Sequence, residues 1–116
     1  MKLIINIEDK SIEVPDVTKC SGMGKISGLM FKEAKKAEAV LFDFGHPTMQ
    51  AIHSFFCPHF IAVWLDESGN ILEWRRISGR MASITPSCEF SKLLEIPLNS
   101  KYAPVVEFLS RTERFK

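Results

Sequence analysis

The sequence predicts a mainly β, α+β fold: a mostly antiparallel β sandwich or half-barrel, with a short helix near a Gly-Leu-Met element and a C-terminal helix. Three observations indicate this class. Short β-prone runs recur between residues 3 and 97, turn-forming residues separate them, and helical spacing of apolar residues appears near the end of the chain. With 116 residues, one core can form without metal or disulfide staples, so we expect a single domain over residues 1–116.

The first element predicted is a strand pair. Leu3, Ile5 and Ile7 alternate with other residues, and Ile12 and Val14 repeat the pattern after a polar turn. This alternation predicts an N-terminal hairpin.

A glycine-rich segment follows at 17–30. Asp16 or Thr18 could cap a helix there, but three interior glycines each cost about 1 kcal/mol relative to alanine. We therefore expect a short or broken helix. Residues 32–38 are polar and predict one turn or a loop.

Strand signals dominate from residue 39. Segment 39–44 predicts a strand that ends at a turn over 45–47, and 49–56 predicts another strand. Segment 60–65 is apolar throughout, which is typical of a central strand buried on both faces. Residues 66–70 then favour a hairpin loop, because Gly and Asn tolerate positive φ and Asp and Ser close local turns.

The return strand is predicted over 71–77. Regular alternation would place Ile71, Glu73, Arg75 and Ile77 on one face and the even-numbered residues on the other. Its neighbour, the Ser/Thr-rich connection 78–89, is long for a compact domain, so it is a candidate functional loop.

Two elements complete the chain. Residues 90–97 predict the last strand. Val105, Phe108 and Leu109 then follow helical spacing, and Pro104 suits a first turn, which together predict the C-terminal helix.

Charge and hydropathy exclude several function classes. Fifteen Lys+Arg balance 14 Asp+Glu, for a net charge of +1, and no segment concentrates positive charge, so we expect no nucleic-acid partner. No apolar run approaches the roughly 20 residues that span a bilayer, and residues 1–6 turn polar too early for a secretory signal. We therefore expect a cytoplasmic protein without a membrane partner. Cys20, Cys57 and Cys88 are odd in number and widely spaced, which predicts reduced, mostly buried, structural thiols.

Five short motifs occur in a specific order. Lys25-x-x-Gly28-Leu29-Met30-x-Lys32 comes first, followed by Val40-Leu41-Phe42-x-Phe44, Ile52-His53-Ser54-Phe55-Phe56, Ile61-Ala62-Val63-Trp64-Leu65-Asp66 and Leu93-Leu94-Glu95-Ile96-Pro97. In this order and spacing, over about residues 17–99, they resemble the domain-of-unknown-function 192 (DUF192) family, the uncharacterised ancient conserved region. The resemblance implies a small β-rich domain with a helix near the Gly-Leu-Met element. It implies no established activity.

Three positions depart from the pattern of the family. Ala62 stands where the family usually has Asp, Cys57 where Met is usual, and Asn99 where Gly is common. If that Asp serves a family site, the resemblance implies that this chain has lost or altered it. Asn99 can adopt the left-handed conformation that Gly would adopt.

Polar side chains from several segments form a candidate ligand-binding set. If the sheet brings some of them together, guanidinium groups and a carboxylate could orient an anionic or polyhydroxyl ligand. A surface salt-bridge network is the alternative. We expect a pocket bordered by 78–89 and by the strand that carries 74–76. The set comprises Lys25, Lys32, Trp74, Arg75, Arg76, Arg80 and Glu95.

His53, Cys57 and His59 form the most metal-like spacing, because imidazole and thiolate are good zinc or copper ligands. Pro58 breaks the strand regularity, however, and no fourth ligand is obvious. A packed cysteine with partly exposed histidines is therefore the alternative. Cys57 or Cys88 could also act as a nucleophile, with His53, His59 or His46 as its base.

The chain is thus predicted to be a small non-enzymatic module that binds an unknown small molecule or protein partner, since no catalytic constellation or phosphate loop stands out. The alternative is a small metal-binding or thiol-dependent enzyme that uses His53, Cys57 and His59. We expect no cofactor. An exposed strand edge would also allow a homodimer.

Overall fold

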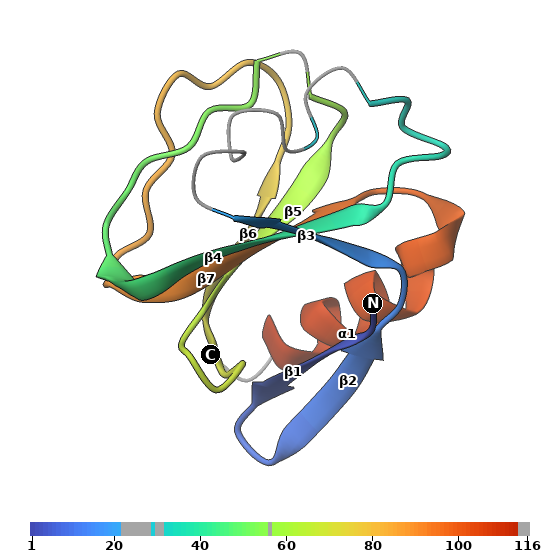
Figure 1. Ribbon diagram of the computed structural model, residues 1–116. Coiled ribbons are helices and arrows are strands. Elements are labelled where there is room, and N and C mark those ends of the chain that lie inside the picture. The colour runs from blue at the N-terminus through green and yellow to red at the C-terminus, as the bar shows by residue number, and fades with distance from the viewer. Residues whose placement is uncertain (22–28, 30–31, 56, 114–116) are drawn as a thin grey trace.

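The computed structural model describes residues 1–21, 29, 32–55 and 57–113. Within them the chain forms a two-stranded sheet, a five-stranded sheet and one α-helix (Figure 1). The mainly β, α+β fold class with mostly antiparallel pairing is confirmed. Apart from Leu29, the helix expected near the Gly-Leu-Met element lies outside the described residues.

The two-stranded sheet is the predicted hairpin. Strands β1 (Leu3–Ile7) and β2 (Lys10–Val14) pair antiparallel, with Ile5 opposite Ile12. Ile5 and Val14 are fully buried, because the hairpin packs one side against the core and leaves the other to solvent.

The five-stranded sheet has the order β3-β4-β7-β5-β6. Only β3 and β4 pair in parallel; the other neighbours are antiparallel. Strand β5 lies between β6 and β7 and is buried along its whole length, which confirms the central strand predicted from its apolar run. The strands are β3 (Val17–Ser21), β4 (Ala39–Thr48), β5 (Phe60–Leu65), β6 (Ile71–Ile77) and β7 (Phe90–Pro97).

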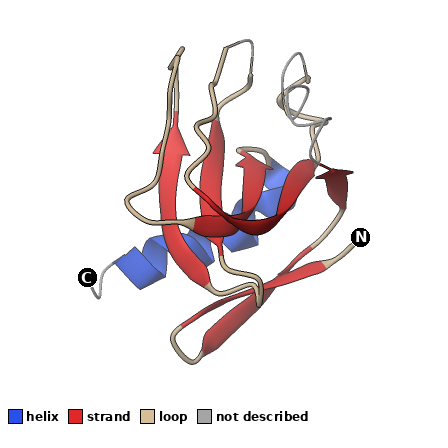
Figure 2. Cartoon of the chain, turned by 60° about the vertical axis from the view of Figure 1, so that its left-hand side comes forward, coloured by secondary structure: helices blue, strands red, loops and turns tan. Residues whose placement is uncertain are grey.

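Each face of this sheet has its own cover. The helix face, which carries Val63 and Leu94, packs against the hairpin, against the 3-10 helix η2 (Ser100–Tyr102) and against α1 (Ala103–Glu113). The loop face, which carries Trp64 and Leu93, packs mainly under long loops. Figures 1 and 2 show α1 and the hairpin on one side of the sheet and the loops on the other. The C-terminal helix is confirmed.

Tyr102 joins three parts of the chain on the helix face. Its hydroxyl donates to the carbonyl of Asp16 over 2.8 Å and accepts from the N–H of Ala39 over 2.7 Å. The side chain is fully buried, and this burial raises the pKa of the hydroxyl, which keeps it protonated. One side chain therefore connects the end of the hairpin to the start of β4.

The hairpin loop between β5 and β6 is also confirmed. Asp66 Oδ1 accepts from the N–H groups of Ser68 and Asn70, both over 2.9 Å. Gly69 has a φ of +87°, and a Cβ there would lie 2.9 Å from the carbonyl oxygen of Ile4. The positive φ favours glycine, and the close approach of β1 leaves no room for a Cβ.

The short helix expected over 17–30 is wrong for residues 17–21, which form β3. Val17 is 2% exposed and belongs to the core. Pairing with β4 supplies the tertiary contact that decides between the two structures, since local propensity is a weak preference. Residues 22–28 and 30–31 lie outside the described residues. The turn expected within 32–38 is present, with Ala37 N–H donating to Glu33 O over 2.8 Å.

Two further expectations are corrected in the middle of the chain. The turn predicted at 45–47 is part of β4, which continues to Thr48 with a register irregularity and with Gly45 at a φ of +75°. Such irregularities let Gly and Pro stay in a strand. Segment 49–56 is not a strand in its described part: only Ile52 forms a bridge, and it pairs with Ile84 in a loop rather than with the sheet.

A bulge in β6 changes the predicted alternation. Trp64 pairs with Glu73, but the next residue, Leu65, pairs with Ile71. The extra residue, Leu72, is 41% exposed. Ile71 therefore shares the helix face with Trp74 rather than the loop face with Glu73, because a bulge reverses the alternation of side chains.

The expectation of mostly buried cysteines is also wrong. Cys88 is exposed, while Cys20 and Cys57 are half-buried. Separately, within the ranges given above, the helices fall short of the length and hydrophobicity that crossing a bilayer requires.

Candidate functional site

The loops over the loop face are tied to each other. Ile52 and Ile84 exchange two backbone hydrogen bonds of 3.0 and 2.8 Å. The buried hydroxyl of Ser54 donates to Gly79 O over 2.7 Å and accepts from Met81 N–H over 2.8 Å. Segments 49–55 and 78–89 therefore form one hydrogen-bonded layer. The second of them is the long connection that the sequence analysis named as a candidate functional loop.

Arg75, a predicted ligand-binding residue, holds this layer to the sheet. Its Nε donates to Glu73 Oε2 over 2.8 Å, its Nη2 donates to the carbonyl of Thr85, and its guanidinium lies 4.9 Å from the ring centre of Trp64. Glu73 Oε1 accepts from Ser87 N–H over 2.8 Å. Burial raises the pKa of Glu73, but hydrogen bonds from Ser87 and Arg75 outweigh it and leave the pKa below its ordinary value. The guanidinium is thus occupied inside the chain.

The other predicted ligand-binding residues do not converge on one place. Trp74 packs against the helix-face core. Arg76 lies on the same face, because its cross-strand partner Ile61 belongs to that core. Arg80 is exposed in the loop 78–89. Lys25 lies outside the described residues. In the pocket expected between 78–89 and 74–76, Arg75 could therefore bind a ligand only if it released Glu73 and Thr85.

Glu95 is a buried carboxyl in the middle of the loop face. It is 5% exposed, and its cross-strand neighbours are Val40 on β4 and Ala62 on β5. Burial raises the pKa of Glu95 to about 7, against the effect of a hydrogen bond donated by Leu29 N–H. Aspartate at position 62, which the family resemblance implies as usual, would have its Cβ about 5 Å from that of Glu95 across the strand pair.

The segment proposed for metal or thiol chemistry is not assembled for either. Burial and the charge of Glu95 raise the pKa of Cys57 to about 11, so its thiol stays protonated and is a poor nucleophile at neutral pH. The His53 ring packs against Phe55 at 5.6 Å, and His59 is exposed. In the part of the chain that is described, no three His, Cys, Asp or Glu side chains are grouped to hold a metal ion.

A polar pocket of about 310 Å³ opens beside β3 and β4. Lys32, which sequence predicted as a ligand-binding residue, contributes to it, and Lys36 brings a second ammonium group from the same turn. Lys36 has only a weak exposed partner, Glu33, at 3.9 Å. We call this site the lysine pocket; it is lined by Thr18, Cys20, Lys32, Lys36, Ala37, Glu38 and Val40.

Sequence reasoning missed Lys36 and Thr18. The available signal was the alternation of Thr18 and Cys20, which places both side chains on one side of a strand. Assigning that segment to a helix concealed it. Val40 links the pocket to the middle of the sheet, because it also neighbours Glu95.

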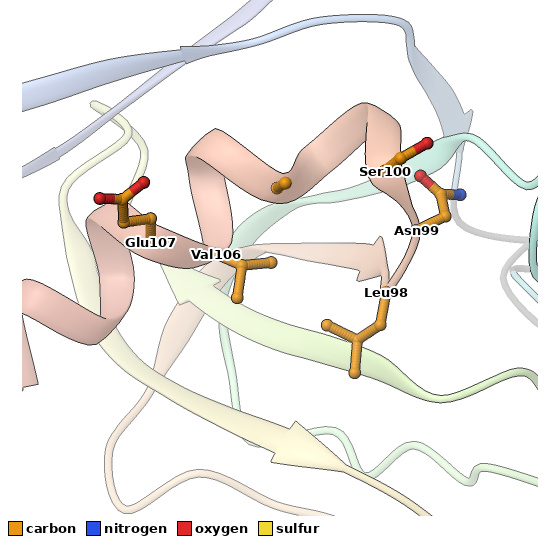
Figure 3. A pocket seen from close by; sticks show the side chains of 6 residues that line it. Leu98, Asn99, Ser100, Val106 and Glu107 are labelled. Carbon is orange, nitrogen blue, oxygen red and sulfur yellow. The ribbon is translucent and has the colours of Figure 1, made fainter.

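A second hollow lies on the outside of α1. It has a volume of about 440 Å³ and is wide open; Figure 3 shows its lining residues, Leu98, Asn99, Ser100, Ala103, Val106 and Glu107. Asn99 does not adopt the left-handed conformation expected for it: its φ is −139°. Its side chain instead donates to Ala34 O and Ala37 O over 3.0 and 2.9 Å, which fixes the turn that carries the two pocket lysines.

These features define a mainly β domain with one face packed by a helix and hairpin and the other by loops. No family model and no curated protein matches the chain. Among solved structures, it is similar to a candidate transcription regulator from Sinorhizobium meliloti 1021, with 15% identity, a TM-score of 0.68, and coverage of 88% of this chain and 81% of that chain. It is also similar to a protein of unknown function from Novosphingobium aromaticivorans DSM 12444, with 12% identity, a TM-score of 0.66, and coverage of 87% and 74%. At these identities the likeness shows the fold alone.

Proposed function

We propose that the chain is a non-enzymatic binding module that takes an anionic ligand in the lysine pocket. The observation that supports this most directly is the convergence of Lys32 and Lys36 on a pocket whose other polar groups include the Thr18 hydroxyl. Ammonium groups and a hydroxyl donate hydrogen bonds to carboxylate or phosphate oxygens. Ala37 and Val40 add an apolar surface for the carbon atoms of the ligand.

The charge balance inside the pocket favours an anion. Glu38 is the acidic residue that lines it, and its carboxylate pairs at 3.4 Å with Lys101 of the neighbouring η2, which also pairs with Asp16 at 3.2 Å. Among the described residues Lys32 has no ion-pair partner. Two ammonium groups therefore remain available to a ligand.

The family resemblance is compatible with this function. We propose membership of the DUF192 family from the five motifs, and that family implies no established activity. The thiol-enzyme alternative has less support, because the pKa of about 11 leaves little Cys57 thiolate at neutral pH.

Small anions test the proposed function. We expect citrate and phosphate to raise the melting temperature and to shift the amide resonances of Thr18, Cys20 and Lys36, whereas neutral glycerol at equal concentration does neither. Lys32→Gln and Lys36→Gln should each weaken citrate binding about fivefold, which corresponds to an exposed ion pair of about 1 kcal/mol.

Lys35→Gln is the matched control, because Lys35 belongs to the same turn but borders a different hollow, with Ala34 and Leu98. It should bind citrate as the unchanged chain does. If Lys35→Gln weakens citrate binding as much as the pocket variants do, net charge alone explains the loss, and the pocket assignment is wrong.

A further inference from the structure

Strand β3 lies at the edge of the five-stranded sheet, and the described residues cover only part of its outer side. Val17 N–H donates to Met1 O over 2.7 Å, and the Met1 amino group donates to Val17 O over 2.9 Å. In a strand, the backbone groups of alternate residues point to the same side. Lys19 therefore directs its N–H and C=O outward as Val17 does, and the described residues place no strand against them.

The edge has the geometry that an added strand needs. The β3–β4 register is continuous from Val17 to Ser21, with neither a bulge nor a proline. The contact with Met1 shows that the backbone of another segment can form hydrogen bonds with this side. Unpaired strand edges bind extended peptides through main-chain hydrogen bonds, and neighbouring pockets select the side chains.

The lysine pocket lies where such selection would occur. Thr18 and Cys20 line it from β3 itself, so alternate side chains of a strand added beside β3 would lie on the same face of the sheet as the pocket. Nearby acidic groups already have partners: Asp43 lies 3.8 Å from Lys19, and Glu38 lies 3.4 Å from Lys101. Lys32 and Lys36 thus favour an acidic side chain.

We propose that the outer edge of β3 and the lysine pocket together bind an extended acidic peptide segment of a partner protein, added as a sixth strand. This inference rests on the proposed function, because it names the ligand class for the same pocket. Backbone hydrogen bonds to Lys19 provide the alignment, and glutamate or aspartate side chains provide the selectivity.

The test is a titration of the ¹⁵N-labelled full chain with a seven-residue peptide in which valine and glutamate alternate. We expect shifts centred on Thr18, Lys19 and Cys20, and slower hydrogen exchange at the Lys19 amide. A peptide with lysine in place of glutamate should bind at least about tenfold more weakly. Two glutamate peptides are N-methylated at alternate residues, one in each register. The one whose methyl groups fall on the amides that face β3 should also lose about tenfold, since it cannot complete the ladder.

Charge reversal checks the pocket without changing the edge. The double variant Lys32→Glu/Lys36→Glu should prefer the lysine peptide, whereas Lys35→Glu should keep the original preference. All three lysines are exposed, so both variants should melt near the temperature of the unchanged chain.

The outcomes separate the two proposals. Undiminished binding of both N-methylated peptides, with methyl groups in either alternate register, would overturn strand addition, as would shifts confined to the hollow around Leu98 and Val106. If citrate binds in the lysine pocket but the peptide does not, the peptide inference is wrong and the proposed function stands. If neither binds, both are wrong.

Discussion

The helix face and the loop face of the five-stranded sheet bury similar numbers of large apolar side chains but use them differently. On the helix face, Leu94 and Leu109 belong to one apolar core, in which the described residues include no buried charged side chain. On the loop face, the apolar core surrounds the buried carboxyl of Glu95, and hydrogen bonds of Ser54 and Arg75 hold the cover in place. The comparison teaches that one face stabilises the fold mainly by apolar packing, with the hydrogen-bonded Tyr102 hydroxyl inside it, while the other keeps a buried carboxyl at a cost.

The largest expected effect is on the helix face. Leu109→Ala should lower the free energy of unfolding by about 3 kcal/mol, because the fully buried side chain leaves a cavity against the sheet. Urea denaturation measures this loss. Glu107→Ala on the same helix removes only an exposed pair with Arg111 and should change stability by less than about 0.5 kcal/mol. Similar losses in the two variants would contradict the packing role of this face.

A second effect, of comparable size but dependent on pH, belongs to the loop face. The pKa of Glu95 is about 7 in the folded chain and 4.5 when the carboxyl is exposed to solvent, as in the unfolded chain. The folded state therefore holds the proton more tightly. Stability should therefore be greatest below about pH 4.5 for this group and fall as pH rises through 7. The full loss is on the order of 3 kcal/mol.

Glu95→Gln should remove this decline between pH 5 and pH 8, which melting curves at several pH values would show. Its amide oxygen can still accept from Leu29 N–H. Glu107→Gln is the control and should follow the unchanged chain. A decline that persists in Glu95→Gln would assign the titration to another group.

The smallest effect concerns the loop layer. Ser54→Ala removes the hydroxyl that bonds Gly79 and Met81 and should cost about 1 kcal/mol. Hydrogen exchange at the amides of Ile52 and Ile84 should quicken more than at Val63 in β5. Uniform acceleration across the sheet would show that the layer is not a separate unit.

Elements with local signals were predictable from sequence. The unbroken apolar run of β5 predicted a central strand. The Asp66–Asn70 turn was predictable because its hydrogen bonds come from its own side chains. The bulge at Leu72 was not predictable, because it depends on the register with β5 rather than on β6 alone.

The site was harder to predict than the fold. β3 forms because β4 is available to pair with it, 22 positions later in the register, whereas the candidate caps Asp16 and Thr18 suggested a short helix instead. Once β3 is known, Thr18 and Cys20 point to the lysine pocket. Arg75 was chosen as a ligand-binding side chain, but its partners, Thr85 and Glu73, lie within the chain.

The hydroxyl of Tyr102 has a consequence for the order of folding. It reaches Asp16 across 86 positions and Ala39 across 63, so these bonds close only when the C-terminal third is in place. During synthesis, the corner before β3 must therefore wait for a residue made 86 positions later. We expect the first strands to acquire protection from hydrogen exchange late, and Tyr102→Phe to leave that corner exchanging rapidly in an otherwise assembled molecule.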